Sequence, residues 1–413
     1  MSVLVVDNGG YSVKYGFSLD DSPKVSPNCI AKSVCERRTY IGSQILGCKN
    51  FSSLRFRRPI DRVGYLVNWE SEKVIWDQLF SQKDFIVDYS ETSLLLTEPP
   101  YNFPQLQLAY DQIIFEEYEF QSYCKCIASS LVPWSNDRIY GVQREMNKPR
   151  EFSLVVDSGF SFTHIIPLVS GKIQWKAVKR LNVGGKLLTN YLKEIISFRH
   201  YDIMDEFYLA DQIKESCCFV SSNFNEDIEI SKGNKPGDIL IDYVLPDYSI
   251  NKQGFVLVPD FQDDLIKERQ ILTLKNERFI VPEILFNPSI IKLNQAGVSE
   301  AIMQSLKLLE YDLQELLLAN IFLIGGNSFF KGYSERLRNE LRSLAPAHCK
   351  ISIYCPDNPD TFAWMCGSSL ACDTEIFNEK KVTRVEYMEY GSNIFLKKSG
   401  LNPDKEFDFI SYE

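Results

Sequence analysis

The sequence predicts an α/β protein of two lobes with a ligand cleft between them, on three observations. An apolar strand that runs into Asp, a small polar residue and Gly occurs twice, at residues 3–10 and 153–160. A second apolar strand follows each turn, so each copy predicts a β-hairpin. A third apolar strand, at residues 321–324, ends in two glycines and precedes a helical pattern. Because 413 residues exceed what one hydrophobic core usually organises, the two copies indicate two lobes.

The tips of the two hairpins carry candidate binding residues. Each tip has a carboxylate, Asp7 or Asp157, followed by glycine: Gly9 and Gly10 in the first copy, Gly159 in the second. Backbone N–H groups exposed at such turns form an anion site, and a carboxylate can hold a hydrated divalent cation. Two facing hairpins would therefore hold the phosphates of a nucleotide, with Asp7 and Asp157 bound to Mg²⁺ through water. A single Asp-x-Gly is usually only a turn, so the prediction depends on the duplication.

The third glycine turn adds Gly325, Gly326 and Asn327 to the candidate site. It stands between the strand at residues 321–324 and a helix predicted over residues 329–344. The N-terminus of a helix presents unpaired N–H groups and a partial positive charge to an anion. We therefore expect this turn to present a helix N-terminus to the same ligand.

The first lobe is expected to begin with the hairpin at residues 3–17 and to continue through a loop-rich stretch, residues 20–54. The basic run from Arg55 to Arg58, with Arg62 close by, is compatible with a local basic patch, but we favour a solvated loop that makes ion pairs. A turn at Pro59 leads into an amphipathic helix that ends near Leu79, because its apolar residues have helical spacing. Residues 93–98 form a short buried strand stopped by two prolines, and residues 108–131 are expected to be helical.

The second lobe is expected to begin with the repeated hairpin. Residues 180–188 contain Gly-Gly-Lys but lack the spacing of a P-loop, and Leu187 stands where a Mg²⁺-binding hydroxyl would be needed. We reject the P-loop interpretation and predict that these glycines begin a helix over residues 187–198. Further helices are predicted over residues 206–220, carrying Lys214 and Glu215, and over residues 299–318.

Residues 221–276 are polar, apart from one apolar run at residues 239–245. Exposed apolar residues rimmed by polar ones mark interaction sites, so one interpretation is an excursion that docks a partner. The alternative is a solvated insertion whose apolar run packs on its own lobe. Both interpretations stay open at this point.

Composition excludes several classes of protein. A formal net charge of −10 and a pI near 5.1 oppose a surface devoted to nucleic acid. Eleven cysteines without paired CxxC spacing, and only three histidines, predict no structural metal site and suit the reducing cytosol or nucleus. The chain enters a strand at residue 3 without a signal-peptide pattern. No run approaches the roughly 18 apolar residues of a membrane span, so no membrane partner is expected.

Together these motifs resemble actin and the actin-related proteins over nearly the whole chain. The hairpin tips resemble the two phosphate loops of the family, and Lys14 stands at its phosphate-facing lysine position. Residues 94–98 resemble the buried strand, residues 278–288 a signature of the second lobe, and Gly325 with Gly326 the adenosine-side turn. The resemblance implies the actin fold, in which two lobes with duplicated ribonuclease-H-like cores enclose a nucleotide cleft and divide into four subdomains.

On this resemblance the first lobe comprises residues 1–147 and 362–413, forming subdomain 1, with a small subdomain 2 at about residues 29–59. The second lobe comprises residues 148–361. Its subdomain 3 covers residues 148–183 and 294–361, and its subdomain 4, with the polar insertion, covers residues 184–293. Lys214 and Glu215 match the ribose-and-adenine side of the cleft.

Within the family, five strings resemble the sixth, nuclear class of actin-related proteins: residues 64–69, 157–164, 182–190, 241–247 and 276–279. That class is a scaffold subunit of the Swr-type chromatin remodelling complex, which exchanges a variant histone into nucleosomes and so affects transcription. The resemblance implies docking on the large remodeller ATPase subunit and on a HIT-type zinc-finger subunit, with any contact to nucleosomes or histones indirect. It also implies residence in the nucleus and in the cytoplasm.

Departures from actin bear on mechanism. In the first phosphate loop, Gly10 replaces a Ser of actin and Tyr11 replaces a Gly. In the second, Phe160 replaces an acidic residue and Ser161 replaces a Gly. Ala128 stands at the water-orienting glutamine, on a predicted helix, and its side chain has neither donor nor acceptor. We therefore expect no actin-type ATP hydrolysis, and a site for ATP or ADP with Mg²⁺ that is weak or absent.

The segment that matches the subunit-gripping loop of actin, at about residues 32–45, is short. This predicts a subunit of a hetero-complex rather than a homopolymer. Two other functions share the fold. An active ATPase or sugar kinase would need a catalytic Asp in a convincing motif, and we find none. A cytoplasmic actin-like filament protein is disfavoured by the short loop.

Overall fold

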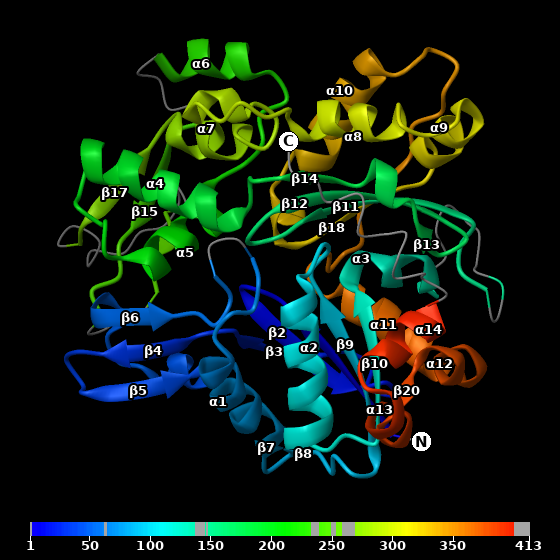
Figure 1. The fold of residues 1–413 in the computed structure, drawn as a ribbon. Coiled ribbons are helices and arrows are strands. Elements are labelled where there is room, and N and C mark those ends of the chain that lie inside the picture. The colour runs from blue at the N-terminus through cyan, green and yellow to red at the C-terminus, as the bar shows by residue number, and fades with distance from the viewer. Residues whose placement is uncertain are drawn as a thin grey trace.

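The computed structural model describes residues 2–61, 64–136, 145, 148–232, 239–248, 253–257 and 269–399. It has two lobes, each built on one six-stranded sheet with helices packed against it, which confirms the predicted α/β fold (Figure 1). In Figure 1 the first lobe, in blue, cyan and red, lies below the second, in green to orange. The predicted boundary at residue 147 and the tail from residue 400 lie outside the described residues.

The two large sheets repeat one topology. In the first, β1 pairs antiparallel with β2 and parallel with β9, and in the second, β11 pairs antiparallel with β12 and parallel with β18. The first sheet has the order β20-β10-β9-β1-β2-β3 and the second the order β13-β12-β11-β18-β19, with β14 paired to β12. The bounds of the first sheet are β1 (Ser2–Asn8), β2 (Ser12–Phe17), β3 (Lys24–Pro27), β9 (Thr92–Glu98), β10 (Ser122–Ile127) and β20 (Val382–Thr383). Those of the second are β11 (Phe152–Ser158), β12 (Thr163–Val169), β13 (Lys172–Ile173), β14 (Lys179–Leu181), β18 (Ile321–Ile324) and β19 (Ile353–Tyr354).

The predicted duplication is confirmed in register as well as in sequence. Asp7 lies opposite Lys14 in the first hairpin, and Asp157 lies opposite His164 in the second. Both carboxylates therefore stand near the end of equivalent central strands, next to the turn that leads into the second strand of the hairpin.

Three small sheets complete the strands. One belongs to the first lobe, β4 (Ile30–Ser33), β5 (Arg38–Ile41) and β6 (Leu54–Arg57), and one to the second, β15 (Ile241–Val244), β16 (Phe255–Val256) and β17 (Ile271–Leu274). The pair β7 (Ser81–Gln82) and β8 (Phe85–Ile86) follows α1. Strands β4 and β5 form a tight hairpin with Ser33 opposite Arg38, so the segment that matches actin's gripping loop is compact.

Side-chain caps mark the start of two of the described α-helices, α1 and α13. At the start of α1, the side chain of Asn68 accepts the N–H of Ser71 at 2.9 Å, which is a standard N-cap. The first lobe contains α1 (Trp69–Phe80), α2 (Pro104–Gln112), α3 (Ala128–Leu131), α11 (Phe362–Cys372), α12 (Thr374–Lys380), α13 (Arg384–Tyr390) and α14 (Asn393–Ser399). The second contains α4 (Gly185–Arg199), α5 (Phe207–Cys217), α6 (Phe224–Lys232), α7 (Glu277–Glu283), α8 (Val298–Leu306), α9 (Tyr311–Leu318) and α10 (Tyr333–Leu344).

Of the four clusters of buried apolar side chains among the described residues, one lies at the small β4–β6 sheet and three hold the main layers together. One fills the second lobe and one fills the first. The third draws side chains from both large sheets, such as Val5 and Val155, and includes Trp364 of α11. The indole N–H of Trp364 donates to the carbonyl of Val5 at 2.9 Å. The two lobes therefore share a packed apolar core.

The helix predicted over residues 108–131 is wrong. Helix α2 ends at Gln112, a π-helical turn covers residues 113–117, and Glu119 turns the chain with a φ of 60°. Residues 122–127 then form β10, which pairs parallel with β9. The apolar spacing of these residues is compatible with a helix or with a strand. The edge of β9 decides in favour of a strand, because pairing with β10 satisfies backbone groups of β9 that a helix at this place would leave without partners.

The apolar run at residues 239–245, on which the docking interpretation of residues 221–276 depended, is not an exposed patch. Ile239, Tyr243 and Val244 are 7%, 0% and 0% exposed, and Tyr243 belongs to the core of the second lobe. The apolar run therefore packs on its own lobe, as the alternative interpretation held. The helix predicted over residues 299–318 is two helices, α8 and α9, separated at residues 307–310.

Within the described ranges, no helix combines the length and the apolar character needed to cross a bilayer. All 11 cysteines are free thiols.

Candidate functional site

The structure brings the two hairpin tips into direct contact between the lobes. A methyl group added to Gly10 would lie 3.0 Å from the Ser161 Oγ atom and 3.7 Å from the ring of Phe160. The contact joins residues of the first lobe to residues 150 positions later in the second. The tips thus face each other, as the sequence predicts, but without a wide gap between them.

The predicted carboxylates lie on the two sides of this contact. Asp7 accepts a hydrogen bond from the Thr97 hydroxyl at 2.7 Å, and its Oδ2 atom lies 3.6 Å from Lys14 Nζ. Asp157 accepts one from the Ser129 hydroxyl at 3.2 Å. Burial and the negative charge of Asp7 raise the pKa of Asp157 to about 6. A cation would relieve this repulsion, so the pair fits a hydrated divalent ion.

The glycine amides at the tips are used inside the protein. The N–H of Gly9 donates to the carbonyl of Asp7 at 3.1 Å, and that of Gly159 donates to Phe162 at 2.9 Å. The carbonyl of Gly159 in turn accepts the N–H of Gly185 at 3.0 Å, at the start of α4. The N-terminus of α4 is therefore capped by the second hairpin tip rather than left open to a ligand.

The third glycine turn braces the second hairpin. The amide of Asn327 donates to the Ser158 hydroxyl at 3.1 Å and to the Gly159 carbonyl at 2.9 Å. Gly325 has a φ of +90°, and a methyl group there would lie 2.4 Å from the Ser158 carbonyl oxygen, whereas one at Gly326 would meet open space. A 3-10 helix, Gly326–Phe329, follows the turn. The expectation that α10 itself begins there is wrong, because α10 starts only at Tyr333.

Lys214 is held by its own helix and its neighbour. Its ammonium group donates to Asp211 at 2.6 Å and to the Thr189 hydroxyl at 2.9 Å, and both partners are buried. Although burial opposes it, the charge of Lys214 lowers the pKa of Asp211. The lysine predicted to face a ribose or adenine therefore neutralises a carboxylate within the protein.

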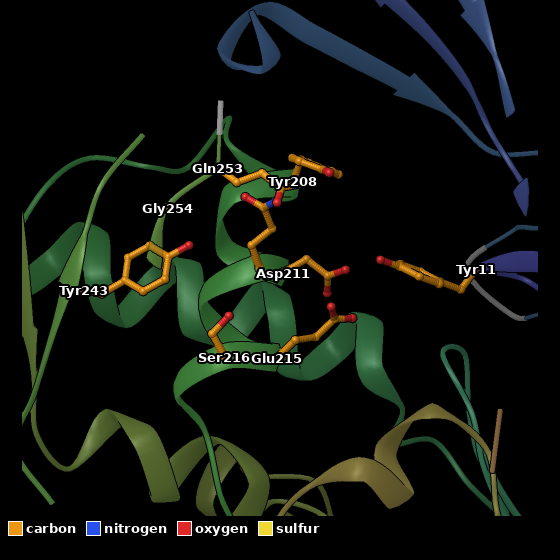
Figure 2. Close-up of a pocket in the computed structure, with 9 residues that line it drawn as sticks. Tyr11, Tyr208, Asp211, Glu215, Ser216, Tyr243, Gln253 and Gly254 are labelled. Carbon is orange, nitrogen blue, oxygen red and sulfur yellow. The ribbon is translucent and has the colours of Figure 1, made fainter. Parts of the chain in front are cut away.

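Glu215 lines a cavity of about 310 Å³ beside this ion pair (Figure 2). Figure 2 shows that the cavity is walled by α5, by Tyr243 and Gly254 of the small sheet region, and by Tyr11 from the other lobe. Burial and the charge of Asp211 raise the pKa of Glu215 to about 7. The cavity is therefore acidic and hydroxyl-rich.

Four side chains close the cleft above the hairpin tips, and we call them the aromatic clasp: Tyr11 and Arg58 from the first lobe, Phe160 and Phe207 from the second. The rings of Tyr11 and Phe160 lie 5.2 Å apart between centroids. The guanidinium group of Arg58 lies 4.7 Å from the Phe160 centroid, 5.3 Å from that of Tyr11 and 5.8 Å from that of Phe207. It also donates to the carbonyls of Gly10 and Tyr11 at 3.3 and 3.2 Å.

The hydroxyl of Tyr11 extends the clasp across the cleft. It points toward the Asp211 carboxylate (Figure 2). Burial raises the pKa of Tyr11, and the charges of Asp211 and Glu215 raise it further. Tyr11 therefore stays protonated and can donate to Asp211, which already accepts from Lys214.

A second aromatic contact joins the lobes farther out. Phe51 stacks on Tyr208 at 4.7 Å between centroids with the rings 12° from parallel, and Phe56 lies 6.4 Å from the same ring. Phe51 also approaches Tyr248 at 6.5 Å. The β4–β6 sheet is thus attached to α5 of the other lobe.

The fit to Mg²⁺-nucleotide differs between the two parts of the site. The carboxylate pair suits a hydrated cation. The cradle around it does not suit a chain of phosphates, because the tips touch, the glycine amides at positions 9 and 159 are bonded internally, and Lys214 is paired with Asp211.

Several contributors to the site were missed from the sequence, among them Phe207 of the aromatic clasp. Arg58 was assigned to a solvated loop, which is wrong, since residues 54–57 form β6 and Arg58 enters the cleft. Asp211 and Ser129 were not singled out. The three-residue spacing of Asp211 and Lys214 on a helix is the one signal that predicts their ion pair.

Comparison with known proteins agrees with this architecture. The family model described as "Actin" matches residues 1–399. The chain is 38% identical to actin-related protein 6 of Drosophila melanogaster over 394 residues, which cover 94% of this chain and 98% of the relative. It is 37% identical to actin-related protein 6 of Neurospora crassa over 434 residues, covering 98% and 96%. It is 38% identical to actin-like protein ARP6 of Cryptococcus neoformans over 418 residues, covering 96% and 84%.

Proposed function

The chain belongs to the actin family, and from this premise we propose that it is a non-polymerising scaffold subunit of a nuclear Swr-type chromatin remodelling complex. Within the family it belongs to the class of its actin-related protein 6 relatives. The complex would exchange a variant histone into nucleosomes and thereby affect transcription. The protein would act in the nucleus and also be present in the cytoplasm.

The observation that carries a scaffold role is the chemistry at the base of the cleft. Ala128 is the first residue of α3, directly after β10, and the next residue, Ser129, donates to Asp157. Ala128 is therefore adjacent in the chain to a residue that contacts Asp157, and the resemblance to actin assigns it the position of the water-orienting glutamine. A methyl group cannot orient a water for in-line attack on a phosphate. We propose that the protein does not hydrolyse ATP.

The aromatic clasp supports a role that does not depend on nucleotide. It supplies contacts between the lobes that a bound ligand would otherwise provide. We propose that ATP or ADP with Mg²⁺ binds weakly or not at all, and that no structural metal is needed.

The proposed partners are the large Swr-type ATPase subunit and a HIT-type zinc-finger subunit. The compact β4–β5 hairpin lacks the length to grip a following subunit in a filament, which supports a hetero-complex over a homopolymer. Any contact with nucleosomes or histones would be indirect. We propose no membrane partner.

Two measurements test the proposal. In the first, the tagged chain is purified from its own cells and the co-purifying subunits are identified. We expect recovery of the remodeller ATPase and the zinc-finger subunit, and recovery of filaments of this chain alone would overturn the scaffold role.

The second measures ATP hydrolysis. Phosphate release by the purified chain with Mg²⁺-ATP should equal that of a heat-inactivated sample. Turnover comparable to that of actin would show the alternative, an actin-fold ATPase. The variant Ala128→Gln is expected to stay inactive, because Tyr11 and Phe160 still fill the cleft.

A further inference from the structure

A groove of about 950 Å³ lies beside α4, separate from the cavity at Glu215. We call it the α4 groove. Its walls come from the second hairpin tip, from β14, from α4 and from the segment that precedes α5. The side chains that line it include Phe162, Arg180, Lys186, Leu187, Lys193 and Met204. The scaffold role proposed above does not use this groove.

The sequence of α4 explains why one of its faces forms a wall. Leu188, Leu192 and Ile196 are fully buried in the core of the second lobe. The residues that line the groove, at positions 186, 187, 190, 191, 193 and 194, recur at helical spacing on the opposite face. Phe198 continues that outward face and is 91% exposed. Helix α4 therefore presents a long, mixed apolar and charged surface, of which Leu187 and Tyr191 are partly buried against the core.

The groove is cationic in a protein that is acidic overall. Among the described residues, it is lined by Arg180, Lys186 and Lys193 and by one carboxylate, Glu194, whereas the whole chain carries a formal charge of −10. Arg180 and Lys193 have defined partners: the Arg180 guanidinium group stacks 3.6 Å from the Phe162 ring centroid, and Lys193 donates to the Met204 carbonyl at 2.9 Å. A local positive surface on an acidic protein favours an acidic ligand, and Arg in particular matches the geometry of carboxylates.

Apolar side chains lie between these cations. Leu187 and Tyr191 of α4 and Ile291 from the facing 3-10 helix line the groove, and Met204 there is 46% exposed. Such side chains give a ligand an apolar anchor, and Met adapts to different shapes. The volume is at the upper end of small-molecule sites, which suits several residues of an extended chain.

We propose that the α4 groove binds an extended acidic peptide segment of a partner protein, with carboxylates at Arg180, Lys186 and Lys193 and a large apolar side chain between them. A nucleic-acid strand fits the groove less well. It would need a continuous row of cations along its phosphates, and here Glu194 and the apolar side chains interrupt that row.

A synthetic peptide tests the proposal on the full chain. The probe is a fluorescein-labelled 12-residue peptide of Glu and Asp with a central Leu-Phe pair, and binding is followed by fluorescence anisotropy at low salt. Two control peptides replace the acidic residues by Lys or the Leu-Phe pair by Ala-Ala. Saturable binding of the acidic probe is expected, with weaker binding of both controls and a loss of affinity as salt is added.

Charge reversals assign the binding to the groove. The variant Lys186→Glu/Lys193→Glu should weaken binding at least about tenfold, because it reverses both cations of α4. The matched variant Lys172→Glu/Lys307→Glu makes the same change of charge at exposed lysines outside the groove and should bind like the wild type. Met204→Ser tests the apolar anchor at an exposed residue and should also weaken binding. Thermal melting checks that each variant is folded.

Three results would overturn the proposal. One is equal binding of the acidic peptide and its Lys counterpart. Another is an equal loss in both charge-reversal variants, which would indicate a general effect of net charge. The third is tighter binding of a labelled single-stranded oligonucleotide that is lost in Lys186→Glu/Lys193→Glu, which would assign the groove to nucleic acid.

Discussion

Truncation of Tyr11 tests whether protein side chains hold the two lobes together. Tyr11 is 36% exposed, so about two thirds of its side chain is buried in the clasp. Two thirds of roughly 200 Å² at about 25 cal/mol per Å² amounts to roughly 3 kcal/mol, less where the unfolded chain is compact. The ring pair with Phe160 contributes about 0.5–1.5 kcal/mol. We therefore expect Tyr11→Ala to lower the free energy of unfolding by about 2–4 kcal/mol, and Tyr11→Phe, which keeps the ring, by about 1 kcal/mol.

The assay is equilibrium unfolding in urea of the purified chain. Phe198→Ala is the control: Phe198 is 91% exposed, so an aromatic ring is removed there with little loss of buried area. It should cost less than about 1 kcal/mol. A double-mutant cycle with Phe160→Ala isolates the pair across the cleft and should give a coupling of about 0.5–1.5 kcal/mol.

The reasoning would be refuted by a Tyr11→Ala variant as stable as Phe198→Ala, or by a coupling energy of zero with Phe160. Adding Mg²⁺-ATP supplies a further readout. It should not stabilise the wild type, and a clear stabilisation would show that the cleft opens to nucleotide despite the clasp.

Three further predictions concern the carboxylate pair, the glycine turn and the apolar run. The pKa of Asp157 is about 6 in the folded protein against about 3.9 in the unfolded chain, so this residue lowers the free energy of unfolding as pH rises from about 4 to 6. Asp157→Asn should remove about 1–2 kcal/mol of that loss between pH 4.5 and 7.5, measured by urea unfolding. An unchanged dependence of stability on pH would contradict this prediction. Gly325→Ala should lower the free energy of unfolding by at least about 2 kcal/mol, because an alanine there is strained at a positive φ and meets a carbonyl oxygen. Gly326→Ala should change the free energy of unfolding by no more than about 0.5 kcal/mol. Equal melting temperatures for the two variants would count against this account of the turn. Tyr243→Ser should lower the free energy of unfolding by about 3 kcal/mol or more in thermal or urea unfolding, because the ring is fully buried. Ile230→Ser is the control on α6, where the residue is 52% exposed, and it should have little effect. A stable Tyr243→Ser protein would restore the docking interpretation.

Local patterns in the sequence were enough for the duplicated hairpins, the position of Asp7 and Asp157, the glycine turn and the start of α4. Each depends on residues adjacent in the chain: alternation of apolar side chains, a turn that needs glycine, a helix that begins after Gly184. These features are decided by backbone sterics and short-range hydrogen bonds, so a sequence contains them. The resemblance of the same strings to a family also determined the two-lobed arrangement.

Only the tertiary structure decided what the cleft contains. Residues 122–127 form a strand because β9 offers them an unpaired edge, and Tyr243 is buried because the core of the second lobe covers it. The clasp joins positions 11, 58, 160 and 207, and Lys214 turns to Asp211 rather than to a ligand. Apart from the three-residue spacing of Asp211 and Lys214 on one helix, no local pattern encodes these partners, because side chains at a lobe interface take the positions that burial and charge pairing allow once both lobes are folded.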